Sequence, residues 1–211
     1  MKHNQYLMAV AVVLLCAGAL MWRSSHSVAP LPSLGPDVQE RFQGVGRILG
    51  EEAGKVLKPN TTVVICRQPV KVWIPENELA GFTKALQQAR LKITEGPVLK
   101  FATEAGAPVY YLTQEQYAAI QQSTPGVVAI ITFGGLPSPA TVAVMQESST
   151  HPRVIVINEE ARRVRPLLAS NVVTWAAVQR YEPIPNAASE PKTAREQFDR
   201  DYQLLGETAK P

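Results

Sequence analysis

Hydrophobic positions follow two patterns along this chain. Residues 6–22 form a nearly continuous apolar run, bracketed by Lys2 and Arg23. From residue 61 onward, short runs rich in β-branched residues alternate with segments in which apolar residues recur every three or four positions. Short apolar runs of this kind are typical of strands covered on both faces. Apolar residues that recur every three or four positions are typical of amphipathic helices. The pattern therefore predicts an apolar N-terminal helix followed by an α/β domain.

The predicted elements alternate regularly. Buried strands are expected at residues 61–67, 127–133, 153–158 and 172–178. Shorter strands are expected at residues 91–94, 97–101 and 109–112. Helices are expected at residues 37–57, 75–89, 113–122, 138–145 and 160–169, with a polar closing helix at 193–205. Because strands alternate with helices from residue 61 to residue 180, we expect an α/β fold: a single three-layer domain with a mostly parallel sheet.

Three helix starts carry capping signals. Asp37 is followed three residues later by Glu40, and Thr113 by Gln116, which is the spacing of a capping box. Ser138 precedes a proline, a favourable combination of N-cap and first helical residue. These signals predict where the three helices begin.

The chain is therefore divided into four parts. We expect a membrane anchor or signal sequence at residues 1–23, and a Ser/Pro-rich linker at 24–36. The α/β domain follows at residues 37–180, and a Pro-rich tail with the closing helix at 181–211.

The apolar run determines the expected location. About 17 residues are the lower limit for a helix that crosses the hydrocarbon core. Ala17-Gly18-Ala19 resembles a signal cleavage site, but cleavage there would cut inside the run. We therefore favour a single-pass anchor in the cell membrane with the domain on the extracytoplasmic, periplasmic side. The alternative is a protein secreted after signal cleavage.

Three glycines lie on one stripe of the first predicted helix. Gly46, Gly50 and Gly54 are spaced by four, and each costs an isolated helix roughly 0.5 to 1 kcal/mol relative to alanine. A close backbone contact would compensate this cost. That contact is either helix packing within the domain or a homodimer that forms through these glycines beside the membrane.

Charge and metal-binding residue types exclude some functions. The net charge of +3 and the scattered basic residues argue against nucleic-acid binding. Cys16 lies in the apolar run and Cys66 in a predicted strand, so they are not expected to pair. His3, His26 and His151 are far apart in sequence, which argues against a zinc site. No cofactor is expected.

Polar residues at the strand ends are the candidate ligand-binding residues, because ligands of open parallel sheets bind beyond the carboxyl ends of the strands. Two arginines could receive an anionic group, and a Gly-Gly pair could let the backbone approach a ligand. No dinucleotide-binding, P-loop or nucleophile-elbow motif accompanies them, so no catalytic residue is expected. The candidates are Arg67, Gln68, Thr132, Gly134, Gly135, Asn158, Glu159 and Arg180.

The order of elements resembles one lobe of the sugar-type periplasmic substrate-binding proteins, which have a Rossmann-like α/β fold. The resemblance rests on residues 127–133, 153–158 and 172–180. A complete protein of that family has two lobes, and this chain has room for one. The resemblance implies a non-catalytic role in binding a small ligand.

Three functions follow as hypotheses. The first is a membrane-tethered extracytoplasmic domain that binds or senses a small ligand. The second is a structural or scaffolding component of an envelope assembly, which the glycine stripe and the Pro-rich tail favour. The third is an extracytoplasmic hydrolase or transferase, with a site built from Glu159 or Glu160 and from Arg67 or Arg180.

Overall fold

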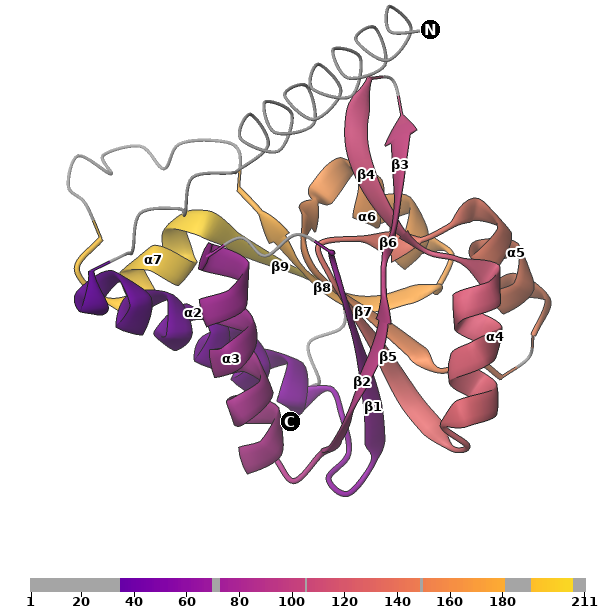
Figure 1. The fold of residues 1–211 in the computed structure, drawn as a ribbon, viewed down its shortest axis with the longest axis horizontal. Helices are drawn as coiled ribbons and strands as arrows, with labels where there is room; N and C mark the ends of the chain where they lie inside the picture. Colours follow the sequence, from indigo (N-terminus) through magenta and orange to yellow (C-terminus); the bar gives the residue numbers. More distant parts are fainter. Residues whose placement is uncertain (1–34, 70–72, 105, 149, 181–190, 207–211) are drawn as a thin grey trace, which may run out of the picture. The chain divides into compact units, whose positions relative to one another are not determined.

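A six-stranded sheet forms the centre of the domain. The computed structural model describes residues 35–69, 73–104, 106–148, 150–180 and 191–206. The strand order is β2-β1-β5-β7-β8-β9 (Figure 1). The first five strands are parallel, and β9 pairs antiparallel with β8 at one edge. The bounds are β1 Thr62–Arg67, β2 Lys92–Val98, β5 Val127–Phe133, β7 Arg153–Glu160, β8 Val173–Gln179 and β9 Tyr202–Gly206.

Helices cover both faces of this sheet (Figure 1). Neighbouring strand residues point to opposite faces, so Ile131 belongs to one buried cluster with Leu49 and Phe82, and Ile130 to the other with Met145. The mostly parallel α/β sheet predicted from the sequence is thus confirmed. The first face carries α2 Pro36–Lys55, α3 Trp73–Gln88 and α7 Ala194–Asp201. The second carries α4 Gln114–Ser123, α5 Pro139–Glu147 and α6 Ala161–Ala169.

A second, three-stranded sheet was not predicted. It has the order β3-β4-β6, with β3 Lys100–Glu104, β4 Ala107–Leu112 and β6 Leu136–Pro137. The strands β3 and β4 form an antiparallel hairpin that stands out beyond the carboxyl ends of the parallel strands (Figure 1). Parallel pairing of β4 with β6 joins this hairpin to the segment that follows β5.

The glycine stripe packs against α3 of the same chain. A Cβ atom added to Gly46 would lie 1.8 Å from the carbonyl oxygen of Glu78, and one added to Gly50 would lie 2.6 Å from that of Phe82. At Gly54 the nearest atom would be 3.4 Å away, an ordinary contact. Helix packing within the domain is therefore confirmed. The predicted homodimer through Gly46, Gly50 and Gly54 is not supported, because α3 of the same chain already covers Gly46 and Gly50.

Two of the three predicted caps are present. The side chains of Thr113 and Ser138 accept hydrogen bonds from backbone N–H groups in the first turns of α4 and α5. The capping box at Asp37 is wrong. Helix α2 begins one residue earlier, at Pro36, and its N-cap is Gly35, which has no side chain to accept a bond.

The closing helix is shorter than predicted. Helix α7 ends at Asp201, and residues 202–206 form β9 instead. The apolar spacing of Phe198, Tyr202 and Leu205 is compatible with a helix, but pairing with β8 gives the backbone of this segment its hydrogen-bond partners and covers the sheet edge.

The predicted anchor at residues 1–23 and residues 24–34 of the predicted linker lie outside the described residues, as do residues 181–190 and 207–211 of the tail. Within the part of the chain that is described, no helix combines the length and the apolar character needed to span a membrane.

Candidate functional site

The crevice between β1 and β5 lies at the point where the strand order reverses, the usual ligand site of open α/β sheets. Four predicted residues line a cavity there: Arg67, Gln68, Gly134 and Asn158. The cavity has a volume of only about 30 Å³, which is room for about one water molecule. The amide of Gln68 donates a hydrogen bond to the carbonyl oxygen of Gly134. Side chains of the protein itself therefore fill this crevice.

The Gly-Gly pair is required by close packing inside the chain. Gly134 has a φ of +78°, a conformation that favours glycine, and a Cβ atom on Gly135 would lie 2.7 Å from the carbonyl oxygen of Tyr110. Thr132 is fully buried, and its hydroxyl donates to the carbonyl oxygen of Gly135 at 2.6 Å. Thr132 therefore lies under this turn and holds it in place.

The two predicted arginines line different openings. Arg67 forms an ion pair with Glu95 at 3.3 Å and lines a groove of about 780 Å³ between α3 and β2. Arg180 follows β8, and its Nε donates to the backbone carbonyl of Tyr202 at 2.8 Å. The predicted rim with both arginines around a single ligand is therefore not formed.

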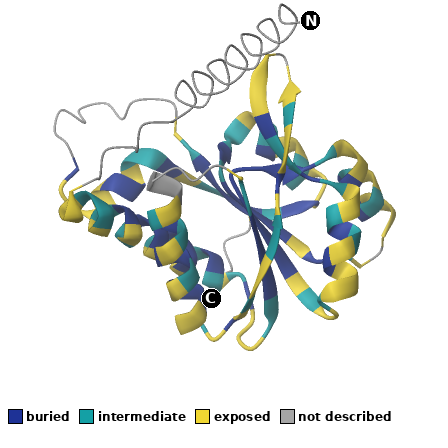
Figure 2. Ribbon diagram, viewed as in Figure 1, coloured by how far each residue is buried: buried dark blue, intermediate teal, exposed yellow. Residues whose placement is uncertain are grey.

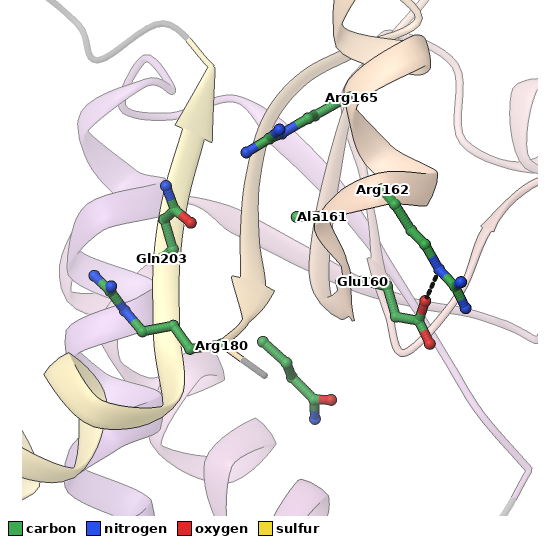
Figure 3. Close-up of a pocket in the computed structure, with 7 residues that line it drawn as sticks. Glu160, Ala161, Arg162, Arg165, Arg180 and Gln203 are labelled. Atoms are coloured by element: carbon green, nitrogen blue, oxygen red, sulfur yellow. Dashed lines mark hydrogen bonds and ion pairs between the residues drawn. The ribbon is translucent and has the colours of Figure 1, made fainter. Parts of the chain in front are cut away.

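Another cavity, larger than the one in the crevice but smaller than the groove at Arg67, lies at the ends of β7 and β8 (Figure 3). Its volume of about 520 Å³ falls within the range of small-molecule sites. Three arginines and one glutamate line it, together with two glutamine amides. The lining residues are Glu160, Ala161, Arg162, Arg165, Gln179, Arg180 and Gln203.

Positive charge exceeds negative charge in this cavity. Glu160 is paired with Arg162 at 2.5 Å (Figure 3), which leaves Arg165 and Arg180 facing the space without a matching carboxylate in the lining. Arg165 has no ion-pair partner among the described residues. Guanidinium groups bind carboxylates and phosphates through parallel hydrogen bonds.

The start of α6 adds to this field. The helix begins at Ala161, and its N-cap residue Glu160 makes no side-chain cap hydrogen bond. The first N–H groups of a helix and its dipole favour a negative charge at this end. The arrangement as a whole therefore suits a small polar ligand with an acidic group.

A buried polar network lies behind the cavity wall. The amide of Gln179 donates to Asn158 Oδ1 at 2.5 Å. The hydroxyl of Tyr202 lies 3.3 Å from the same oxygen and 2.8 Å from Glu78 Oε2. This network holds Gln179, the only member that lines the cavity, in a fixed orientation.

Glu78 is the unusual member of the network, since only 2% of its surface is exposed. Burial raises the pKa of its carboxyl group to about 8, and nearby Asp201 contributes to the rise. The hydroxyl of Tyr202 donates to Glu78 Oε2, which ties the Glu78 carboxyl group to the rest of the network. Burial also raises the pKa of the Tyr202 hydroxyl, so this group remains protonated.

Glu159 lies apart from the cavity. Its carboxylate forms an ion pair with Arg163 at 3.1 Å, and burial raises its pKa. Arg163 in turn lies over the ring of Tyr111 in the β3–β4 hairpin. Of the acid and base pairs considered for a hydrolase, only Glu160 and Arg180 share the cavity.

The described residues hold no group of three His, Cys, Asp or Glu side chains that could bind a metal ion. Cys66 is buried in the strand, as the sequence suggests, and its burial raises the pKa of the thiol to about 12.

Several important residues were not predicted. Arg162 and Arg165 could have been noticed, because they are three residues apart at the start of a helix that follows a strand end. Gln203 was assigned to a helix, and Glu78 is an ordinary acidic position in the sequence of an amphipathic helix. The sequence therefore gave no indication that Gln203 lines the cavity or that Glu78 is buried.

The sequence matches no protein-family model and no curated protein. Its structure is similar to that of GanP, a glucose-galactose binding protein from Geobacillus stearothermophilus, with a TM-score of 0.53 and 13% identity over 78% of this chain and 60% of that chain. It is also similar to a chain of the XylFII-LytSN complex, with a TM-score of 0.50 and 12% identity over 78% of this chain and 59% of that chain. The chain thus spans about 60% of the length of these proteins. The described domain has the fold of the sugar-binding periplasmic substrate-binding proteins, over a region that corresponds to one lobe.

Proposed function

We propose that the α/β domain binds a small polar ligand that carries an acidic group, such as a sugar acid or a sugar phosphate, without converting it. The observation that carries this proposal is the cavity of about 520 Å³ at the ends of β7 and β8, with its three arginines and one glutamate. The charge excess of the lining supports an anionic ligand.

The size and polarity of the cavity support a sugar-like ligand. GanP, which shares the fold, is by its name a glucose-galactose binding protein. In this cavity Gln179 and Gln203 offer amide groups that can both donate to and accept from sugar hydroxyls. Arg165 and Arg180 would bind the acidic group.

We further propose that residues 6–22 tether the protein to the cell membrane and that the domain lies outside the cytoplasm. The apolar run and the likeness to periplasmic binding proteins support this location. Protease added to intact spheroplasts should then remove the domain. Full protection of the domain while the membrane is unbroken would contradict this topology.

A thermal-shift experiment on the purified full chain tests the binding proposal. It compares glucose with two acidic counterparts of the same size class, glucuronate and glucose 6-phosphate. A ligand at a hundred times its Kd stabilises a protein by about 2.7 kcal/mol. We expect stabilisation by an acidic sugar and a much smaller effect of glucose.

Two charge-matched variants locate the effect. Arg165→Gln should remove the stabilisation, because it removes a cavity guanidinium that has no ion pair among the described residues. Arg47→Gln makes the same change on α2, outside the cavity, and should leave the stabilisation intact. Equal responses of both variants, or no stabilisation by any acidic sugar, would contradict the proposal.

A further inference from the structure

The β3 strand leaves one side of its backbone unpaired. In the order β3-β4-β6, β3 is the outer strand, and only β4 pairs with it in the described structure. The outer part of the hairpin is exposed (Figure 2). An exposed strand edge offers N–H and C=O groups to a strand of another chain.

The position of Pro108 shows which groups face outward. Thr103 lies opposite Pro108, which has no N–H group to donate. Hydrogen-bonded and non-hydrogen-bonded pairs alternate along an antiparallel ladder, so Phe101 is also in a non-hydrogen-bonded pair. The backbone groups of Phe101 and Thr103 therefore point away from β4, toward the open edge.

The sequence of this edge is complementary to itself. Reversing Lys100–Glu104 about Ala102 places Lys100 opposite Glu104, and Phe101 opposite Thr103. Both charged pairs then have opposite signs, and the outward backbone groups of residues 101 and 103 face each other. Oppositely charged cross-strand pairs stabilise a sheet, whereas like charges destabilise it.

Phe101 supplies an apolar contact for the same arrangement. Its side chain is 60% exposed, the highest value among the large hydrophobic residues of the described structure, and it is supported on one side by the ring of Tyr110, 5.7 Å away. In the reversed pairing, the two copies of Phe101 become diagonal neighbours on one face, within reach of each other.

We propose that β3 pairs antiparallel with β3 of a second copy of this chain, centred on Ala102, so that two hairpins join into one continuous sheet. This interface is separate from the cavity of the proposed function and does not depend on it.

Disulfide cross-linking in the full chain tests this pairing. In a Cys16→Ser background, Ala102→Cys places two thiols opposite each other in a non-hydrogen-bonded pair, where Cα atoms are about 4.5 Å apart, close enough for a disulfide. Mild oxidation should then give a dimer on a non-reducing gel. Ala107→Cys is the control, because it lies on the same hairpin and is more exposed than position 102, but it belongs to β4, several strand spacings from its copy. It should give no dimer. The native Cys66 is buried and can stay in place.

Backbone and charge variants test the register. Thr103→Pro removes an outward N–H group without removing a bond to β4, so it should abolish cross-linking at position 102, whereas Thr103→Ala should not. Lys100→Glu places two carboxylates opposite each other and should reduce the dimer. Adding Glu104→Lys should restore it.

Equal cross-linking at positions 102 and 107, or cross-linking that Thr103→Pro leaves unchanged, would overturn the proposal. A cross-linked product whose mass differs from that of two copies would also overturn it, since the edge would then bind a different protein.

Discussion

At the scale of single residues, the three glycines of α2 differ in the room that a side chain would find. Gly50→Ala should lower the free energy of unfolding by about 1 to 3 kcal/mol, because the added methyl group would lie 2.6 Å from the carbonyl oxygen of Phe82. Gly54→Ala is the matched control. It meets only an ordinary contact at 3.4 Å, so it should be neutral or stabilise by up to ~1 kcal/mol through helix propensity. Urea denaturation measures both, and stabilisation by Gly50→Ala would refute close packing.

Glu78 should make stability depend on pH. Its pKa is about 8 in the folded protein and near 4.5 when it is solvated, so folding takes up a proton between these values. The contribution of this group to the free energy of unfolding therefore falls as pH rises from about 4.5 to 8. Glu78→Gln keeps an acceptor for Tyr202 but cannot ionise. The free energy of unfolding of this variant, relative to that of the wild type, should rise by more than about 1 kcal/mol between pH 5 and pH 8. Parallel pH curves of the two proteins would show that Glu78 is not protonated.

Residue roles were only partly predictable. The strand-end rule selected Gln68, Asn158 and Arg180, which lie near the carboxyl ends of β1, β7 and β8, because the positions of polar residues after buried runs are visible in the sequence. It could not show that Gln68 closes one crevice while Arg180 lines a separate cavity. Glu78 is buried because of where α3 packs. Its partner there is Tyr202, which lies 124 residues further along the chain, so local sequence patterns do not reveal the contact.

At the scale of elements, local capping signals were reliable where a side chain makes the bond. Thr113 accepts a bond from the N–H of Gln116 and its N–H is bonded in return, the full capping box of α4. Thr113→Ala should therefore cost about 1 kcal/mol of stability. Thr124→Ala, at the other end of the same helix, removes no side-chain hydrogen bond among the described residues and should cost much less. Equal losses in thermal denaturation would contradict the role of the cap.

The C-terminal elements were harder to predict, for a physical reason. The segment 202–206 forms a strand because β8 offers it an open edge, and a partner from a distant part of the chain is not visible in local periodicity. The hairpin of β3 and β4 was hard to predict for the same reason. Its short strands were expected, but their pairing with β6 into a separate sheet depends on the path of the chain after β5.

At the scale of the whole molecule, the α/β fold was predictable because alternation of strands and helices restricts the sheet to parallel connections. The function is less restricted by the fold, since one lobe can serve many ligands. We propose an acidic small molecule because of the charge of the cavity at β7 and β8, and we propose a dimer because of the open β3 edge.

Hydrogen–deuterium exchange of the full chain, with and without a saturating acidic sugar, tests the central claim most directly. The account predicts slower exchange in the peptides that contain Glu160–Arg165, Gln179–Arg180 and Gln203, which surround the cavity. Exchange should not change in the peptides around Gly126 and His151, which lie at the amino ends of β5 and β7, away from the cavity. Protection around Gly126 and His151, or no protection at the three cavity segments, would contradict the assignment of this cavity as the ligand site.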